Sequence, residues 1–148
     1  MSTPALITGG CQCGAVRYRA SGLGRSSICH CRMCQRASGN VMAPLVVAEG
    51  IAWEGEPSTW ASSNISERGF CAACGTPLFL RDFDTGRTEV MAGTLDDPSL
   101  APPEYHYGVE SQVHWLKLDD SLPRKETADG GEGIVSRQWP VDPAKEER

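Results

Sequence analysis

The chain has no long hydrophobic run and no cluster of positive charge. Apolar residues make up 40% of its 148 residues, but no run approaches the roughly 20 residues that cross a bilayer. The 14 Lys and Arg are scattered and are outnumbered by 19 Asp and Glu, for a net charge of −5. Because binding to a phosphate backbone needs clustered positive charge, we expect neither a membrane nor a nucleic acid as a partner.

A secretion signal is also missing from the first residues. The stretch MSTPALITGG has no basic region followed by an apolar segment, so we expect a cytoplasmic protein whose thiols stay reduced. The chain holds seven cysteines, an odd number that cannot pair completely in internal disulfides. Reduced cysteines at short spacings are more often metal ligands than redox pairs, and a CxxC oxidoreductase would need a βαβ context that these flanks do not supply.

Long helical periodicity is the third feature that the sequence lacks. Turn signals recur about every ten residues, in a chain with 16 Gly and 10 Pro. This pattern predicts a mainly β, sandwich- or barrel-like domain with short helical turns. Short strands are expected at 5–7, 15–20, 41–48, 58–63, 65–70, 76–83 and 88–93, helical turns at 31–38, and one or two strands, or a strand with a helical turn, within 105–118.

Two local interpretations and a domain boundary complete the expected organisation. Gly22 and Gly24 indicate a turn, and Pro44 makes 41–48 an edge or bulged strand. We expect one domain over 1–126 and a polar extension over 127–148, which Trp139 and Val141 could dock to the core.

Four of the cysteines form two similar short motifs, CQCG and CAACG. Sulfurs that share a tetrahedral zinc ion lie about 3.8 Å apart, a spacing that cysteines on a tight turn can reach. Glycine after the second cysteine lets the chain turn without a Cβ clash. The two motifs therefore predict one closed structural site made by Cys11, Cys13, Cys71 and Cys74.

The remaining cysteines are Cys29, Cys31 and Cys34. Three thiolates around a tetrahedral ion leave one position vacant, which is typical of a catalytic rather than a structural zinc site. Adjacent residues rarely bind one ion, so His30 is more simply a neighbour, and Met33 a core contact. The spacing of the cysteines alone also allows a second way of dividing them between metal sites. Cys31 and Cys34 could join the CAACG pair in a zinc-ribbon-like site, which would leave the other three thiols spare.

Three motifs together resemble a known family. GGCQCGAVRY, CHCRMCQRASG and ERGFCAACGTPL, followed by DDSLP, resemble the glutathione-dependent formaldehyde-activating enzymes, a family that includes centromere protein V-like proteins. The likeness runs over about residues 5–125 and has no counterpart for the 127–148 tail. It implies an Mss4-like β fold with two zinc sites, the closed four-cysteine site and the open site at Cys29, Cys31 and Cys34.

The resemblance also implies an activity. A zinc ion at the open site would activate glutathione, or a similar small thiol, for addition to formaldehyde or another small aldehyde, the reaction of a carbon–sulfur lyase named for its reverse direction. Cys29, Cys31 and Cys34 are then the catalytic residues. Arg36 is the candidate for binding substrate, ahead of Arg32, because glutathione carries two carboxylates.

Other polar side chains have weaker functional interpretations. His106 and His114 are candidates for proton transfer, although a structural or surface role is simpler, and Ser38 and Gly39 could shape the site wall. A different class of function also fits the same cysteines: a non-catalytic, zinc-stabilised binding module or a carrier of a thiol adduct.

Overall fold

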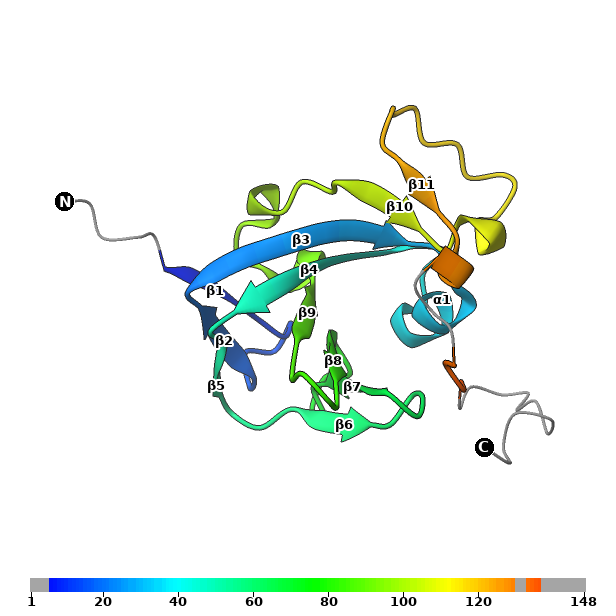
Figure 1. The fold of residues 1–148 in the computed structure, drawn as a ribbon. Coiled ribbons are helices and arrows are strands. Elements are labelled where there is room, and N and C mark those ends of the chain that lie inside the picture. The colour runs from blue at the N-terminus through cyan, green and yellow to red at the C-terminus, as the bar shows by residue number, and fades with distance from the viewer. Residues whose placement is uncertain (1–5, 130–132, 137–148) are drawn as a thin grey trace.

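The protein is built from two sheets packed face to face (Figure 1). The computed structural model describes residues 6–129 and 133–136. The small sheet has the order β1-β2-β5, and the large sheet has the order β11-β10-β3-β4-β9-β8-β7-β6. The strands are β1 (Ile7–Gly10), β2 (Arg17–Ala20), β3 (Gly22–Cys29), β4 (Ala43–Glu49), β5 (Ala52–Glu54), β6 (Ser58–Trp60), β7 (Ser66–Phe70), β8 (Pro77–Asp82), β9 (Thr88–Met91), β10 (Tyr105–Tyr107) and β11 (Arg124–Lys125).

In the part of the chain that the structure describes, helical structure is limited to short segments. The α-helix is α1 (Arg32–Ser38), and four 3₁₀ turns are η1 (Ala92–Thr94), η2 (Pro98–Leu100), η3 (Val109–Ser111) and η4 (Thr127–Asp129). The mainly β fold with short helical turns is therefore confirmed, and the two sheets remain separate rather than closing into a barrel. Within residues 6–129 and 133–136, no helix has the length and apolar character needed to cross a bilayer.

The core lies where side chains of both sheets meet. Tyr18 of the small sheet and Val46, Leu78 and Val90 of the large sheet are all buried in one cluster. Trp53 bridges the layers, with its ring centroid 5.2 Å from that of Tyr18 and 5.0 Å from that of Phe79. Each large apolar side chain buried in this way stabilises the fold by about 1.5–3 kcal/mol.

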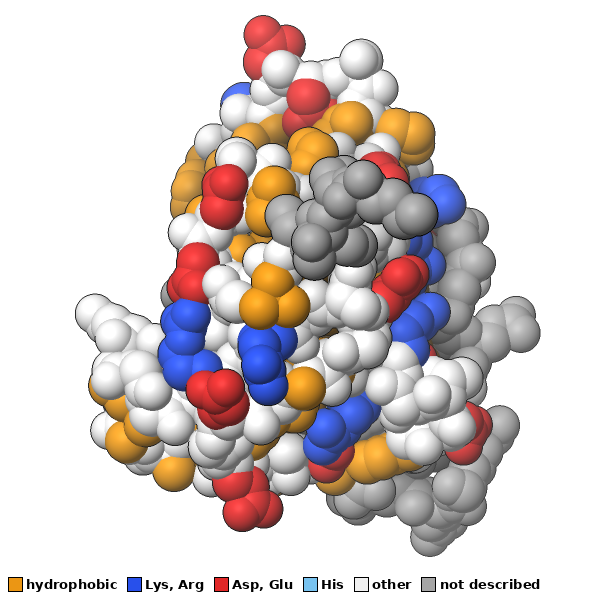
Figure 2. Space-filling view, turned by 90° about the vertical axis from the view of Figure 1, so that its left-hand side faces the viewer, with side chains coloured by type: hydrophobic (Ala, Val, Ile, Leu, Met, Phe, Trp, Pro, Cys, Tyr) orange, Lys and Arg blue, Asp and Glu red, His pale blue; other side chains and the backbone are white. Residues whose placement is uncertain are grey.

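Charged side chains are mixed over the face drawn in Figure 2. Acidic and basic groups alternate there, and no broad patch of one sign gathers on that face. Arg17 pairs with Asp96 at 2.5 Å and Arg19 with Glu54 at 3.9 Å. Such exposed pairs contribute little to stability, about 0–1 kcal/mol each.

Two local predictions are wrong. Gly22 and Gly24 do not form a turn but open the eight-residue strand β3, whose bulge falls between Leu23 and Ser26. The strand around Pro44 is not an edge strand, because β4 lies between β3 and β9. It is not bulged at Pro44 either, because the extra residue in this pair lies on β3, between Leu23 and Ser26. Pro44 is tolerated there since β9 pairs only with Leu45–Val47, one residue further along.

The end of the described chain returns to the domain. Ser136 forms a bridge with Ser63, and the Val135 amide donates to the Asn64 side chain at 2.8 Å. At least this part of the expected extension therefore packs on the large sheet. The boundary at 126 stays a prediction, and Trp139 and Val141 lie outside the described residues.

Candidate metal centres and reaction site

The CQCG and CAACG motifs form matching turns between antiparallel strands. Cys11 and Cys13 lie between β1 and β2, and Cys71 and Cys74 lie between β7 and β8. The amide that follows each cysteine pair donates back to the carbonyl of the first cysteine, Gly14 to Cys11 at 3.2 Å and Gly75 to Cys71 at 2.8 Å. Both glycines have φ near +80°, values of 80° and 79°, which side chains with a Cβ rarely adopt.

These turns bring four sulfurs to one point. The Sγ atoms of Cys11, Cys13, Cys71 and Cys74 all lie within 4.8 Å of one another. Cys13 Sγ is 3.6 Å from Cys11 Sγ and 3.8 Å from Cys71 Sγ, close to the separation of about 3.8 Å expected around a tetrahedral metal–thiolate centre. The alternative zinc-ribbon division is excluded, because Cys71 and Cys74 lie with Cys11 and Cys13.

Hydrogen bonds already prepare these sulfurs to carry negative charge. The Val16 amide donates to Cys11 Sγ at 3.3 Å and lowers the pKa of that thiol. The Thr76 hydroxyl and amide lower the pKa of Cys74 to about 5. Cys13 differs: a backbone amide at Ala15 lowers its pKa, but the crowded thiols of Cys11 and Cys74 outweigh that effect and raise it to about 11. Four thiolates at this spacing therefore need a cation to balance their charge.

The second cluster forms where β3 meets α1. Cys29 ends β3, Cys31 is the N-cap of α1, and Cys34 lies in the first turn of α1. The Cys34 amide donates to Cys31 Sγ at 3.4 Å, so one thiol acts as the helix cap. All three cysteines are buried, with exposed fractions of 4%, 7% and 3%, and their sulfurs lie within 4.8 Å of one another.

The close approach of the three thiols shifts their pKa values in opposite directions. Hydrogen bonds from Cys29 and Cys31 lower the pKa of Cys34 well below its ordinary value, and Arg68 lowers it further. The neighbouring thiols Cys31 and Cys34, together with burial, raise the pKa of Cys29 strongly. A second thiolate is therefore costly here unless a cation joins the cluster. Sulfur-only donor sets suit zinc and other thiophilic metals, and both clusters could bind a metal ion.

The second cluster differs from the first in opening onto a cavity. Its three cysteines line a cavity of about 290 Å³ with Arg25, Arg68, Arg87, Glu89, Tyr107 and other residues. In the described part of the chain, no fourth Cys, His, Asp or Glu completes this group. A tetrahedral ion held by these three sulfurs would have its fourth position available to a ligand from outside the chain.

Several side chains of this site are ones that the sequence did not single out: Arg68, Arg25, Arg87 and Glu89. Arg68 Nη2 donates to Cys34 Sγ at 3.4 Å, across 34 positions of the chain. Arg68 lies on β7 in the stretch ERGF, and nothing in the local pattern marks it, because only the sheet carries it to α1. Arg36, the predicted substrate-binding residue, is exposed and lines a different, larger cavity of about 630 Å³.

The charges around the cysteine cavity are partly paired. Arg25 lies 3.4 Å from Glu89, and Arg87 lies 3.0 Å from Asp82. Burial raises the pKa of Glu89, although Arg25 and Arg87 oppose that effect. Arg68 has no carboxylate partner among the described ion pairs, and its guanidinium donates instead to Cys34 Sγ.

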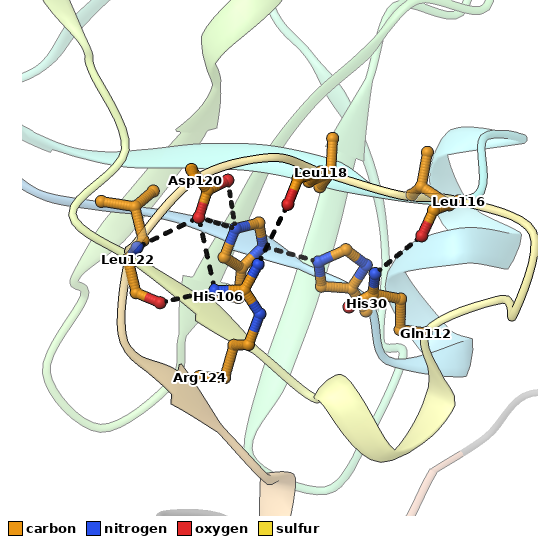
Figure 3. A network of polar contacts seen from close by, with 8 residues as sticks. All are labelled: His30, His106, Gln112, Leu116, Leu118, Asp120, Leu122 and Arg124. Carbon is orange, nitrogen blue, oxygen red and sulfur yellow. Dashed lines mark hydrogen bonds and ion pairs between the residues drawn. The ribbon is translucent and has the colours of Figure 1, made fainter.

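A chain of hydrogen bonds runs from His30, which lies between Cys29 and Cys31 in the sequence, through His106 to Asp120 (Figure 3). His30 Nε2 lies 2.8 Å from His106 Nδ1, and His106 Nε2 lies 2.9 Å from Asp120 Oδ2. The Asp120 carboxylate can only accept, so His106 donates through Nε2 and accepts through Nδ1 from His30. Both imidazoles are fully buried, and burial lowers the pKa of His30.

His30 is thus held by other groups and is not part of the three-sulfur set. Its amide donates to the Tyr107 carbonyl at 2.7 Å, and its carbonyl accepts from the Gln35 side chain at 2.7 Å. A side chain on Gly108, which has φ of 68°, would come within 2.8 Å of the Cys31 backbone. These contacts hold the loop between β3 and α1 in place, so the network positions the cluster.

The other polar candidates lie outside the immediate site. Arg32 bonds to Gln35 on its own helix. Ser38 donates to the Cys34 carbonyl at 2.8 Å, and Gly39 ends α1 with φ of 67°. His114 is exposed, and none of the contacts of the described residues joins it to the cysteines.

Comparisons with known proteins agree with this architecture. A family model described as glutathione-dependent formaldehyde-activating enzyme matches residues 6–111. Among solved structures, the chain is similar to a Rhodobacter sphaeroides protein studied by structural genomics, with a TM-score of 0.51 and 15% identity over 80% of this chain and 98% of that one. That likeness shows the fold alone. A search of curated proteins found no match.

Proposed function

Because the chain belongs to the glutathione-dependent formaldehyde-activating enzyme family, we propose that it is a zinc-dependent carbon–sulfur lyase-type enzyme. It would join glutathione, or a similar small thiol, to formaldehyde or another small aldehyde. The product with glutathione and formaldehyde is S-(hydroxymethyl)glutathione. One observation carries this proposal: the cluster of Cys29, Cys31 and Cys34 lines a cavity and lacks a fourth protein ligand in the described residues.

The two clusters would divide the roles of structure and chemistry. Cys11, Cys13, Cys71 and Cys74 would hold one zinc ion and tie the β1–β2 turn to the β7–β8 turn. Cys29, Cys31 and Cys34 would hold the other. Zinc bound there would supply a Lewis acid that favours the thiolate form of a coordinating thiol. A free thiol is only about 3% thiolate at pH 7, so ionisation alone gives at most about a thirtyfold gain.

The larger part of the acceleration must come from holding the two reactants together. Arg25, Arg68 and Arg87 line the cysteine cavity and would bind the carboxylates of a peptide thiol. Arg68 would also donate a hydrogen bond close to the reacting sulfur, because its guanidinium already contacts Cys34 Sγ.

Exchange spectroscopy by NMR tests this proposal, because adduct formation is already reversible without a catalyst. The protein should accelerate exchange between glutathione and its formaldehyde adduct above the spontaneous rate, and Cys31→Ser should remove the acceleration. Binding of glutathione without acceleration would instead favour the adduct-carrier role. If glutathione neither binds nor reacts faster, the enzyme assignment fails and the binding-module interpretation stands.

A further inference from the structure

A second, larger cavity adjoins the cysteine cavity. It has a volume of about 630 Å³ and lies between α1 and strands β6–β9. Its wall is mainly apolar, and the side chains that matter most here are Met33, Trp60, Phe70, Pro77, Phe79 and Met91. This size and character are typical of pockets that bind small organic molecules.

Two residues belong to both cavities. Met33 and Arg68 line the larger cavity and also the cysteine cavity. Arg68 donates to Cys34 Sγ at 3.4 Å, so the junction lies at the proposed reaction centre. A molecule that fills the larger cavity therefore lies against Arg68, the side chain that also contacts the three-cysteine cluster.

The cavity also contains features that packing alone does not explain. Trp60 and Phe70 are exposed by 52% and 36%, although both are large aromatic residues. Exposed aromatic side chains gathered at a cavity are typical of ligand-binding sites. Ser62 Oγ and Arg68 Nε are buried atoms with no hydrogen-bond partner, and both residues line this cavity. Buried polar atoms nearly always have a partner, so a ligand in this cavity could supply the missing partners.

The dimensions and polarity of the cavity separate the candidate occupants. Formaldehyde is close in size to water, whose share of liquid volume is about 30 Å³, and it would leave this cavity almost empty. Glutathione carries two carboxylates and an ammonium group, which are costly to place against an apolar wall. The occupant that fits is the apolar part of a larger aldehyde.

We infer that the chain's preferred electrophile is an aldehyde with a bulky apolar substituent, aromatic or branched, which occupies the larger cavity while its carbonyl group lies at Arg68. This inference rests on the proposed thiol-addition function. The thiol sulfur forms a bond to the carbonyl carbon, and the π electron pair of the C=O bond moves onto oxygen. Arg68 donates to that oxygen as its charge develops, and the proton lost by the thiol reaches the oxygen through solvent, giving a hemithioacetal.

The test compares 3-phenylpropanal with formaldehyde, each with glutathione, by NMR exchange rates. A separate binding measurement uses 3-phenylpropan-1-ol, which cannot add a thiol. Ala37→Phe should fill the cavity, since Ala37 is an exposed residue of α1 that lines it. The matched control is Ala52→Phe, on an exposed alanine of β5 that lines neither cavity.

The wild type should accelerate 3-phenylpropanal exchange more than formaldehyde exchange. Ala37→Phe should lower the ratio of the two accelerations, and the affinity for the alcohol, by about tenfold or more. Ala52→Phe should match the wild type in both. Circular dichroism confirms that each variant is folded.

Two results overturn the inference in different ways. If formaldehyde exchange is accelerated but the alcohol does not bind, or binds Ala37→Phe equally well, the cavity is not the substrate pocket and the proposed function stands. If the alcohol binds in an Ala37-dependent way but no aldehyde exchange is accelerated, the proposed function fails and the aldehyde assignment fails with it.

Discussion

The two cysteine clusters use the same donor atom but differ in what surrounds them. In the four-cysteine cluster, Cys13 and Cys74 are exposed at the tips of turns, and the sulfur set is complete. In the three-cysteine cluster every sulfur is buried, but the set is one ligand short and lines a cavity. If the three-cysteine cluster is the reactive centre, as proposed, then exposure of the ligands does not mark such a centre, whereas the number of protein ligands and the adjoining cavity do.

The largest expected effect is the loss of a ligand from the complete cluster. Cys71→Ser should abolish stable folding, because a structural zinc site supplies about 10–16 kcal/mol and a whole domain is stable by only about 5–15 kcal/mol. Circular dichroism melting and metal content measure this. Ala72→Ser, an exposed neighbour in the same turn, is the control and should behave like the wild type. A Cys71→Ser protein that keeps its metal and its melting temperature would contradict the structural role.

In the incomplete cluster, the corresponding substitution should separate activity from stability. Serine is a good N-cap residue, so Cys31→Ser should preserve the start of α1, and we expect a stability change of about 1 kcal/mol or less. The second metal ion and the acceleration of adduct exchange should both be lost. Metal analysis measures the loss of the second ion, thermal melting measures the change in stability, and NMR exchange measures the loss of acceleration, all on the same sample. Unfolding comparable to that of Cys71→Ser would show that the two clusters do not differ in role.

Removing the Arg68 guanidinium should slow the reaction at the three-cysteine cluster and leave the four-cysteine cluster unchanged. Arg68→Gln removes the guanidinium that donates to Cys34 Sγ, and we expect adduct exchange to slow by about 100-fold while both metal ions stay bound. Arg19→Gln, an exposed arginine on the small sheet, should change neither. Equal rates for the wild type and Arg68→Gln would remove Arg68 from the reaction.

The smallest expected effect concerns Glu89 in the wall of the cysteine cavity. Burial raises the pKa of this carboxyl, so the folded state binds the proton more tightly than the unfolded state does. This contribution to stability is therefore complete below the unfolded pKa of about 4.3 and is lost as the pH rises through the raised folded pKa. Glu89→Gln should raise the melting temperature at pH 7 by roughly 2–4 °C, and this gain should shrink as the pH is lowered within the range where the metal ions stay bound. A gain that grows as the pH is lowered would reverse the assigned sign.

The division of the cysteines could be predicted from the sequence because its cause is local. A glycine directly after each CxC or CxxC pair selects a turn with positive φ, and Gly14 and Gly75 adopt it. The helical turns at 31–38 were predictable for the same reason, since Gly39 ends α1. Short strands with alternating burial, such as Arg17–Ala20, also follow from local pattern.

The remaining parts of the site depend on contacts between distant segments. Arg68 reaches Cys34 because β7 lies in the same large sheet as β3, whose end leads into α1. The His30–His106 contact joins residues 76 positions apart, through the parallel pairing of β3 with β10. Arg36 is close to Cys34 in the sequence, but its place on the helix directs it to the other cavity. Closeness along the chain therefore predicts which cysteines cluster together, but it does not predict which side chains line the cavity beside them.

The most direct test of the 4 + 3 division is a crystallographic anomalous difference map recorded at the zinc absorption edge. The account predicts two peaks, one enclosed by Cys11, Cys13, Cys71 and Cys74 and one bound by Cys29, Cys31 and Cys34 with its fourth ligand from outside the chain. A single peak at the four-cysteine cluster, in crystals grown with zinc present, would contradict the account.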